Sequence, residues 1–96
     1  MIVYHSTSKK KYRNILVNGF NPVKYAYQHS NPKIKRLYWT WFRPYPQFDY
    51  GDTCIAVDVS NLNYIDNGET IICKELYIPP ERIVGVSYKN KYQKKG

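Results

Sequence analysis

The sequence predicts a small α+β domain, and three observations carry this prediction. One segment, between Ser8 and Gly19, has apolar residues at helical spacing. Several other segments are rich in β-branched and aromatic residues, which favour strands. The 96 residues suffice for one domain and leave no room for a second. We therefore expect one main N-terminal helix on a small, split antiparallel sheet, with the domain at residues 1–89 and a basic tail at 90–96.

The N-terminal segment predicts a strand followed by the helix. Residues 1–5 form a short apolar run typical of a strand, and residues 9–18 form the helix. The Ser8 hydroxyl is suited to cap the first turn, and Gly19 can end the helix in left-handed geometry. The side chains expected to face the core lie at i, i+3 and i+4, and they are Tyr12, Ile15 and Leu16.

The remainder of the chain predicts strands joined by loops. Residues 21–35 show no clear period and are rich in Pro, Asn, Ser and Gln, so we expect a long loop there. Residues 47–50 predict a turn of helix that stops at Gly51. The expected strands are residues 37–42, 53–59, 69–78 and 83–88, with a short addition at 61–64.

The chain is strongly basic, with a formal net charge of +8. Much of the excess lies in residues 9–13, 33–36 and 89–95. Such a surface attracts anions, and nucleic acid or a dinucleotide are the usual candidates. The alternative is that these lysines only maintain solubility, so charge alone does not assign nucleic-acid binding.

The sequence also predicts the compartment of the protein. No apolar run approaches the ~20 residues that cross a membrane, and the N-terminus lacks the layout of a signal peptide. The two cysteines, Cys54 and Cys73, are too few for a disulfide scaffold and lack the spacing of a metal site. We therefore expect a cytoplasmic protein without membrane contact or bound metal, in which both cysteines are buried apolar side chains.

Four motifs resemble one protein family, in the same order along the chain. The stretch YHSTSKKKYRNILVNGF places His5 on the first strand, followed by hydroxyl residues and by a helix that ends in Gly-Phe. RLYWTW supplies Tyr38 within an aromatic strand, and FDYGDTCIAVDV has an aromatic-Gly pair before a strand. KELYIPPERIVGV places Glu75 before Pro and an Arg-Ile pair. Together these motifs resemble the ADP-ribosyltransferases of the diphtheria-toxin and poly(ADP-ribose)-polymerase type, and the chain resembles a minimal single-domain member.

This resemblance implies an ADP-ribosyltransferase-like fold and an enzyme with NAD as its substrate. Such enzymes break the bond between nicotinamide and ribose through an oxocarbenium-like state. Glu75 would stabilise that state, and His5 would hydrogen-bond the adenosine ribose. The Ser6 backbone would pair with the nicotinamide amide, supported by Thr7, and Tyr38 would stack on the nicotinamide ring. No metal is required, and the acceptor would be a protein or a nucleic acid.

Two positions depart from the pattern of the family. Ser6 stands where glycine is usual, so its Cβ would approach the nicotinamide. Cys73 stands where many members that modify proteins have Gln or Glu, which argues against arginine as the acceptor. The small size and high charge of the chain suit a toxin-like effector in bacterial or phage conflict.

Several residues have a second interpretation. His5 is also compatible with a histidine that fills the core. Trp39 or Trp41 can provide the stacking ring in place of Tyr38. Glu69 is a second acid, although it lies beside a turn where a solvated carboxylate is expected.

Two other functions also stay open. An RNA 2′-phosphotransferase would share the fold and would need several basic residues at its phosphate site, for which Arg36, Arg43 and Arg82 are available. A non-catalytic protein on a relic fold would instead bind nucleic acid, a nucleotide or a host protein through its aromatic and basic side chains.

Overall fold

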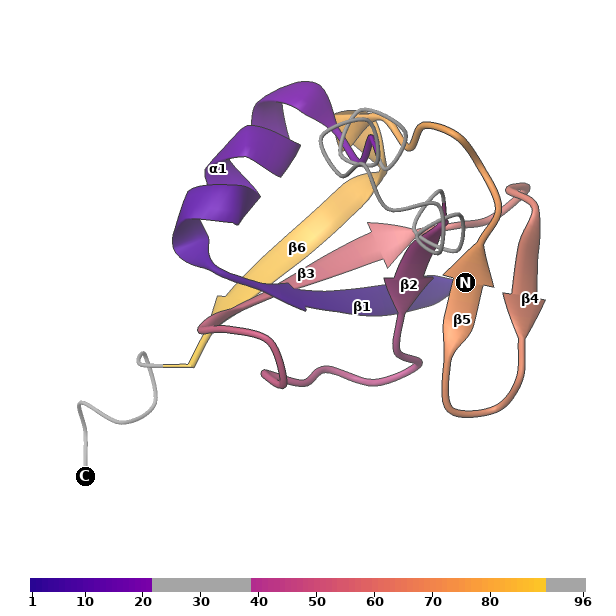
Figure 1. Ribbon diagram of the computed structural model, residues 1–96, viewed down its shortest axis with the longest axis horizontal. Coiled ribbons are helices and arrows are strands. Elements are labelled where there is room, and N and C mark those ends of the chain that lie inside the picture. Colours follow the sequence, from indigo (N-terminus) through magenta and orange to yellow (C-terminus); the bar gives the residue numbers. More distant parts are fainter. Residues whose placement is uncertain (22–38, 90–96) are drawn as a thin grey trace, which may run out of the picture.

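The computed structural model describes residues 1–21 and 39–89, and the predicted basic tail at 90–96 lies outside them. In these two described ranges, two three-stranded antiparallel sheets, ordered β1-β3-β6 and β2-β5-β4, lie beside one α-helix (Figure 1). This arrangement confirms the predicted α+β class. No helix in the described ranges is long and apolar enough to cross a membrane. The elements are β1 (Ile2–Thr7), α1 (Lys9–Asn18), β2 (Thr40–Phe42), β3 (Thr53–Asp58), β4 (Tyr64–Asp66), β5 (Ile71–Cys73), η2 (Pro80–Arg82) and β6 (Ile83–Tyr88).

Helix α1 begins and ends where the sequence predicts. The Ser8 hydroxyl accepts a hydrogen bond from the Lys11 amide at 3.2 Å, which satisfies one free donor of the first turn. Gly19 has φ 73°, and its amide donates to the Ile15 carbonyl at 2.7 Å. The prediction of a buried stripe is wrong for Leu16, whose side chain is 48% exposed. The helix therefore packs on the sheet through a narrower face, with Ile15 partly buried against the core.

The first sheet carries the hydrophobic core on one face. Its register pairs Val3 with Val57 and His5 with Ile55, and residues opposite one another in a sheet share a face. The chain leaves α1 at Phe20, which exchanges backbone hydrogen bonds of 2.8 and 3.0 Å with Ile78. The buried core residues are Val3, Phe20, Phe42, Ile55, Val57, Val59, Ile71, Cys73 and Ile78.

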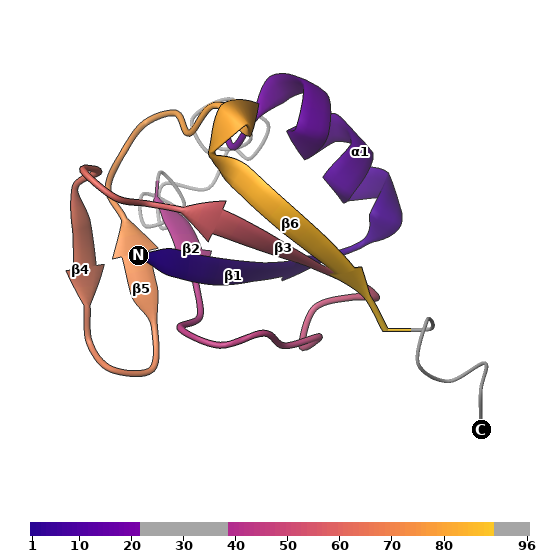
Figure 2. The ribbon, with the colours of Figure 1, turned by 180° about the vertical axis from the view of Figure 1, so that it is seen from behind.

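The two sheets are joined where β1 meets the end of β2. Tyr4 and Arg43 exchange two backbone hydrogen bonds of 2.8 Å. Strands β6 and β4 form the outer edges of the two sheets (Figure 2). Cys54 and Cys73 are buried and free, as predicted, and burial raises the pKa of both thiols.

Several element boundaries differ from the prediction. The strand expected at 69–78 is broken, because Lys74 donates its amide to the Asn63 carbonyl at 2.7 Å and the chain then bends before Ile78. The short strand expected at 61–64 is displaced and forms β4 opposite β5.

Three further expectations concern the segments around β2. Residues 47–50 form no helix, because their polar groups bond locally and to β1; the Gln47 side chain accepts from the Asp49 amide at 2.8 Å. In the described part of the expected strand at 37–42, pairing begins at Thr40. Most of the long loop expected at 21–35 lies outside the described residues.

Candidate functional site

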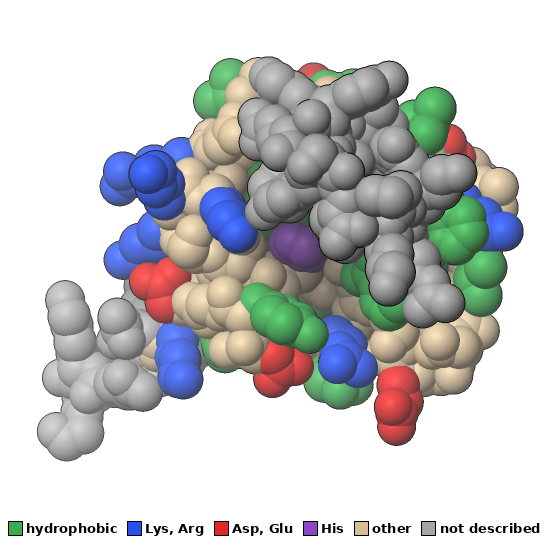
Figure 3. All heavy atoms as spheres, in the orientation of Figure 1, with side chains coloured by type: hydrophobic (Ala, Val, Ile, Leu, Met, Phe, Trp, Pro, Cys, Tyr) green, Lys and Arg blue, Asp and Glu red, His purple; other side chains and the backbone are tan. Residues whose placement is uncertain are grey.

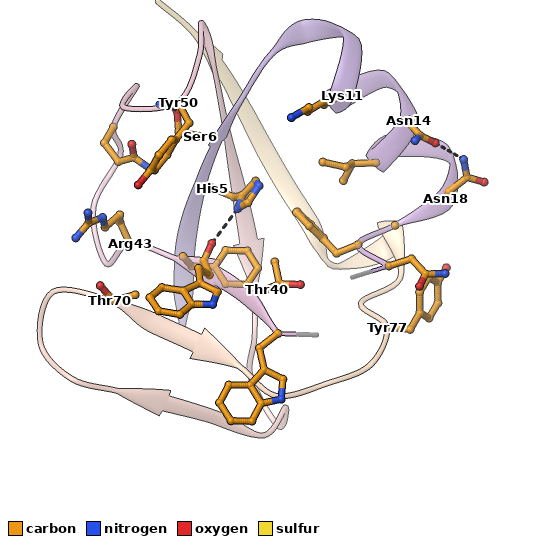
Figure 4. Close-up of a pocket in the computed structure, with 18 residues that line it drawn as sticks. His5, Ser6, Lys11, Asn14, Asn18, Thr40, Arg43, Tyr50, Thr70 and Tyr77 are labelled. Carbon is orange, nitrogen blue, oxygen red and sulfur yellow. Dashed lines mark hydrogen bonds between the residues drawn. The ribbon is translucent and has the colours of Figure 1, made fainter. Parts of the chain in front are cut away.

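A cavity of about 910 Å³ opens between α1, β1 and β2 (Figure 4). Helix α1 forms one wall, while β2 and the segment before β3 form the opposite side, with His5 between them. In the space-filling view the histidine side chain is visible at the bottom of a hollow bordered by basic and apolar side chains (Figure 3). The volume lies within the range of cofactor and small-molecule sites.

His5 is held in one defined orientation. Its Nδ1 lies 2.9 Å from the Trp41 carbonyl oxygen, which can only accept, so Nδ1 carries the proton and donates it. The rings of Phe20 and Phe42 meet the imidazole edge to face, at centroid distances of 5.2 and 5.6 Å. In the neutral ring Nε2 is then an acceptor, on a side chain that lines the cavity.

The surroundings of His5 keep its imidazole neutral. Burial is the largest influence and lowers its pKa from the ordinary value of 6.5. The hydrogen bond to the Trp41 carbonyl opposes this shift in part, and the positive charge of Lys11 adds to it. Near neutral pH, His5 therefore presents an acceptor to a ligand, and it presents no positive charge.

The lowered pKa of His5 makes stability depend on pH. As the pH falls through 6.5, the unfolded chain binds a proton at this residue before the folded protein does, so the free energy of unfolding should fall as the pH decreases below 6.5. In His5→Asn the amide can still donate to Trp41 but does not titrate, so the fall should be smaller. Urea unfolding at several pH values measures both proteins, and His29 is present in each. Equal pH dependence would contradict the assigned state of His5.

Helix α1 contributes a polar wall to the cavity. Lys11, Asn14 and Asn18 lie at i, i+3 and i+7, which places them on one face of the helix. Asn18 donates a side-chain hydrogen bond to Asn14, which orients both amides at the cavity wall. The sequence prediction considers only the apolar stripe of the helix and does not include these three residues in the site. The same helical period predicts a polar stripe beside the apolar one.

The cavity is rimmed by large aromatic side chains that remain exposed. Trp41 is 46% exposed, Tyr77 is 48% exposed and Tyr50 is 75% exposed, and all three line the cavity. Trp39 also lines it, and the Lys74 ammonium lies 5.1 Å above the Trp39 ring. Exposed flat rings around a hollow are suited to stack on a planar ligand group.

The charge of the cavity favours an anion. Lys11 and Arg43 line it, and no Asp or Glu lines it among the described residues. Arg43 is anchored by a hydrogen bond of 3.2 Å from its guanidinium to the Glu69 carbonyl. The combination of two cations, several flat rings and a neutral acceptor suits a ligand that contains phosphate, a ring and hydroxyl groups.

The structure brings together only part of the predicted site. His5 and Ser6 line the cavity, and the Ser6 hydroxyl accepts a hydrogen bond of 3.0 Å from the Tyr50 amide. Thr7 is buried and does not line the cavity. Tyr38 lies outside the described residues.

Glu75 does not line the cavity in the structure. Its side chain is half-buried, and its Oε1 accepts a hydrogen bond of 3.0 Å from the Asn63 amide. Tyr77, two residues further along the chain, does line the cavity. Glu75 is therefore close in sequence to a residue that lines the cavity, but the hydrogen bond of its carboxylate directs the side chain to the loop before β4.

The arginines considered for a phosphotransferase do not gather at the cavity. Arg43 lines it, but Arg82 donates to the Ser60 carbonyl at 2.7 Å and does not line it. Arg36 lies outside the described residues. Within the described part of the chain, only one of the three arginines considered for an RNA 2′-phosphotransferase thus lines the cavity.

Comparisons with protein-family models, with curated proteins and with solved structures found no match to this chain. The functional argument therefore rests on the residues of the cavity and on the sequence motifs that resemble ADP-ribosyltransferases.

Proposed function

We propose that the protein binds NAD in the cavity around His5 and transfers its ADP-ribosyl group to an acceptor, as a minimal ADP-ribosyltransferase. The observation that carries this proposal is the neutral His5, oriented by Trp41 and lining an aromatic cavity whose described lining contains no Asp or Glu. The motifs around His5 and Glu75 supply the resemblance to the family. Two free cysteine thiols are compatible with a reducing compartment such as the cytoplasm.

Each part of NAD has a chemically matched partner in the cavity. The His5 Nε2 accepts a hydrogen bond from a ribose hydroxyl. Lys11 and Arg43 are the two cations among the described lining residues, and they attract the pyrophosphate. Trp41 and Tyr50 offer exposed rings for the nicotinamide or the adenine, a role that the resemblance assigns to Tyr38.

The proposed reaction transfers the ADP-ribosyl group without oxidation or reduction. The bond between ribose C1 and the nicotinamide nitrogen breaks, and its electron pair leaves with neutral nicotinamide. An acceptor O–H or N–H then forms the new bond to C1 and loses its proton to solvent. A carboxylate near the ribose stabilises the positive charge that develops at C1. The resemblance gives this role to Glu75, whose carboxylate must exchange the Asn63 amide for the ribose.

The position of Glu75 favours a second candidate function. A protein that binds a nucleotide without turning it over needs the cavity and does not need a carboxylate in it. Binding of NAD without nicotinamide release would support this candidate.

Calorimetric titration of NAD into wild type and His5→Asn tests the proposal. We expect wild type to bind NAD, and the variant to bind it about 10- to 100-fold more weakly, because the Nε2 acceptor is lost. Glu69→Gln serves as a control, because Glu69 is exposed and does not line the cavity. Equal affinity of wild type and His5→Asn, with both folded by circular dichroism, would overturn the proposal.

A further inference from the structure

The first half of helix α1 carries a dense cluster of positive charge. The α1 basic face consists of Lys9, Lys10, Lys11 and Arg13, all of them exposed. Lysine and arginine side chains gather over this end of the molecule in the space-filling view (Figure 3). The first turn of the helix contains no acid, although acids are the residues that stabilise this end of a helix. The cluster is thus unfavourable for the helix itself, and helix formation does not explain it.

Within the described residues, no side chain of the α1 basic face forms a salt bridge. The one salt bridge found there joins the N-terminal ammonium to Asp58 at 3.6 Å, at the other end of β1. Lys9 lies over the Tyr88 ring at 5.1 Å, which is a contact with an aromatic face. An exposed group of like charges without salt bridges of its own attracts a polyanion.

The α1 basic face is continuous with the cavity. Lys11 belongs to both, because it is part of the cluster and lines the cavity. Lys10 and Arg13 do not line it. At 100° per residue Lys10 lies about 100° from Lys11 around the helix and Arg13 lies about 160° from it, so the basic side chains extend from the cavity around to the outer side of α1. Tyr50 and Trp41 lie exposed on the opposite side of the cavity from α1 (Figure 4). Basic side chains on one side of a cavity and exposed flat rings on the other are the two elements with which proteins bind single-stranded nucleic acid.

We infer that the α1 basic face binds the phosphates of a single-stranded nucleic acid, which is the acceptor that the cavity modifies. The role of the nucleic acid as acceptor rests on the proposed function. The binding of nucleic acid to the α1 basic face does not depend on that function. In the transfer, an O–H or N–H of the nucleic acid forms the bond to ribose C1 as nicotinamide leaves, and its proton goes to solvent. An acidic protein would match the charges but would not use the exposed rings.

The test measures binding of a fluorescein-labelled single-stranded DNA of about 15 nucleotides, and of the matching RNA, by anisotropy without NAD. The variants are Lys10→Gln and Arg13→Gln, which spare the cavity. Lys10→Arg is the matched control, since it changes the same exposed side chain and keeps its positive charge. Unlabelled polyglutamate serves as a competitor that has charge without bases.

We expect each of the two glutamine variants to bind several-fold more weakly at low salt, with a slope of log affinity against log salt that is shallower by about 0.7. Lys10→Arg should keep the slope of wild type. No oligonucleotide binding, equal effects of all three variants, or equally effective competition by polyglutamate would overturn the inference. A separate measurement of NAD binding distinguishes the two proposals. If NAD binds and the oligonucleotide does not, only the inferred nucleic-acid surface is wrong. If the oligonucleotide binds and NAD does not, the proposed transferase function is wrong and the nucleic-acid surface is retained.

Discussion

Replacing Glu75 with glutamine should lower nicotinamide release from NAD by about 100-fold or more, and it should leave the affinity for NAD unchanged. The proposed reaction develops positive charge on the ribose, and a neutral amide does not stabilise that charge as a carboxylate does. The affinity should be unaffected, because Glu75 does not line the cavity in the structure. The effect thus falls on the chemical step.

The glutamine variant also separates chemistry from folding. Its side-chain oxygen can still accept the hydrogen bond from the Asn63 amide, so the loop before β4 should be retained. Nicotinamide release is followed by chromatography at saturating NAD, with Glu69→Gln as the matched loss of an acid. Wild-type activity in Glu75→Gln would show that Glu75 has no role in the mechanism. An equal loss of activity in Glu75→Gln and Glu69→Gln would show that the effect comes from the change in net charge.

Gly19→Ala should destabilise the protein by about 3 kcal/mol or more. Gly19 has φ 73° and ψ −170°, a conformation that is open essentially to glycine alone. A Cβ at this position would also lie 2.3 Å from the Ile78 carbonyl oxygen, which accepts the hydrogen bond of the Phe20 amide. The substitution therefore strains the end of α1 and disrupts the pairing that holds it to the segment after β5.

Gly85→Ala provides the matched control for this prediction. A Cβ at Gly85 would meet only the Ala56 Cβ, at the ordinary contact distance of 3.8 Å. Its free energy of unfolding should therefore lie within about 1 kcal/mol of wild type. Urea unfolding followed by circular dichroism compares the three proteins. Similar stability of Gly19→Ala and Gly85→Ala would contradict the geometry at the end of α1.

The helix could be predicted because its signals are local. The Ser8 hydroxyl and the freedom of Gly19 act within one turn of each helix end, so they need no information from the rest of the chain. The strand expected at 69–78 fails for the opposite reason. Its interruption follows from hydrogen bonds to Asn63 and Phe20, which lie far away in the sequence.

The candidate site shows the same division between local and distant signals. His5 and Ser6 follow from a motif at the end of the first strand, and both line the cavity. The positions of Asn14 and Asn18 on the cavity wall could be predicted from the helical period. The direction of the Glu75 carboxylate could not be predicted, because it depends on the backbone amide of Asn63, twelve residues earlier.

The most direct test of the His5 cavity follows the NAD titration at the imidazole itself. Nuclear magnetic resonance of the isotope-labelled protein resolves the ring nitrogens of His5 and the indole groups of Trp39 and Trp41. NAD should shift the His5 Nε2 and both indole signals along one saturating curve, with Nδ1 still protonated and bonded to the Trp41 carbonyl. Saturable shifts confined to residues outside the cavity, with an unchanged His5 ring, would contradict the account.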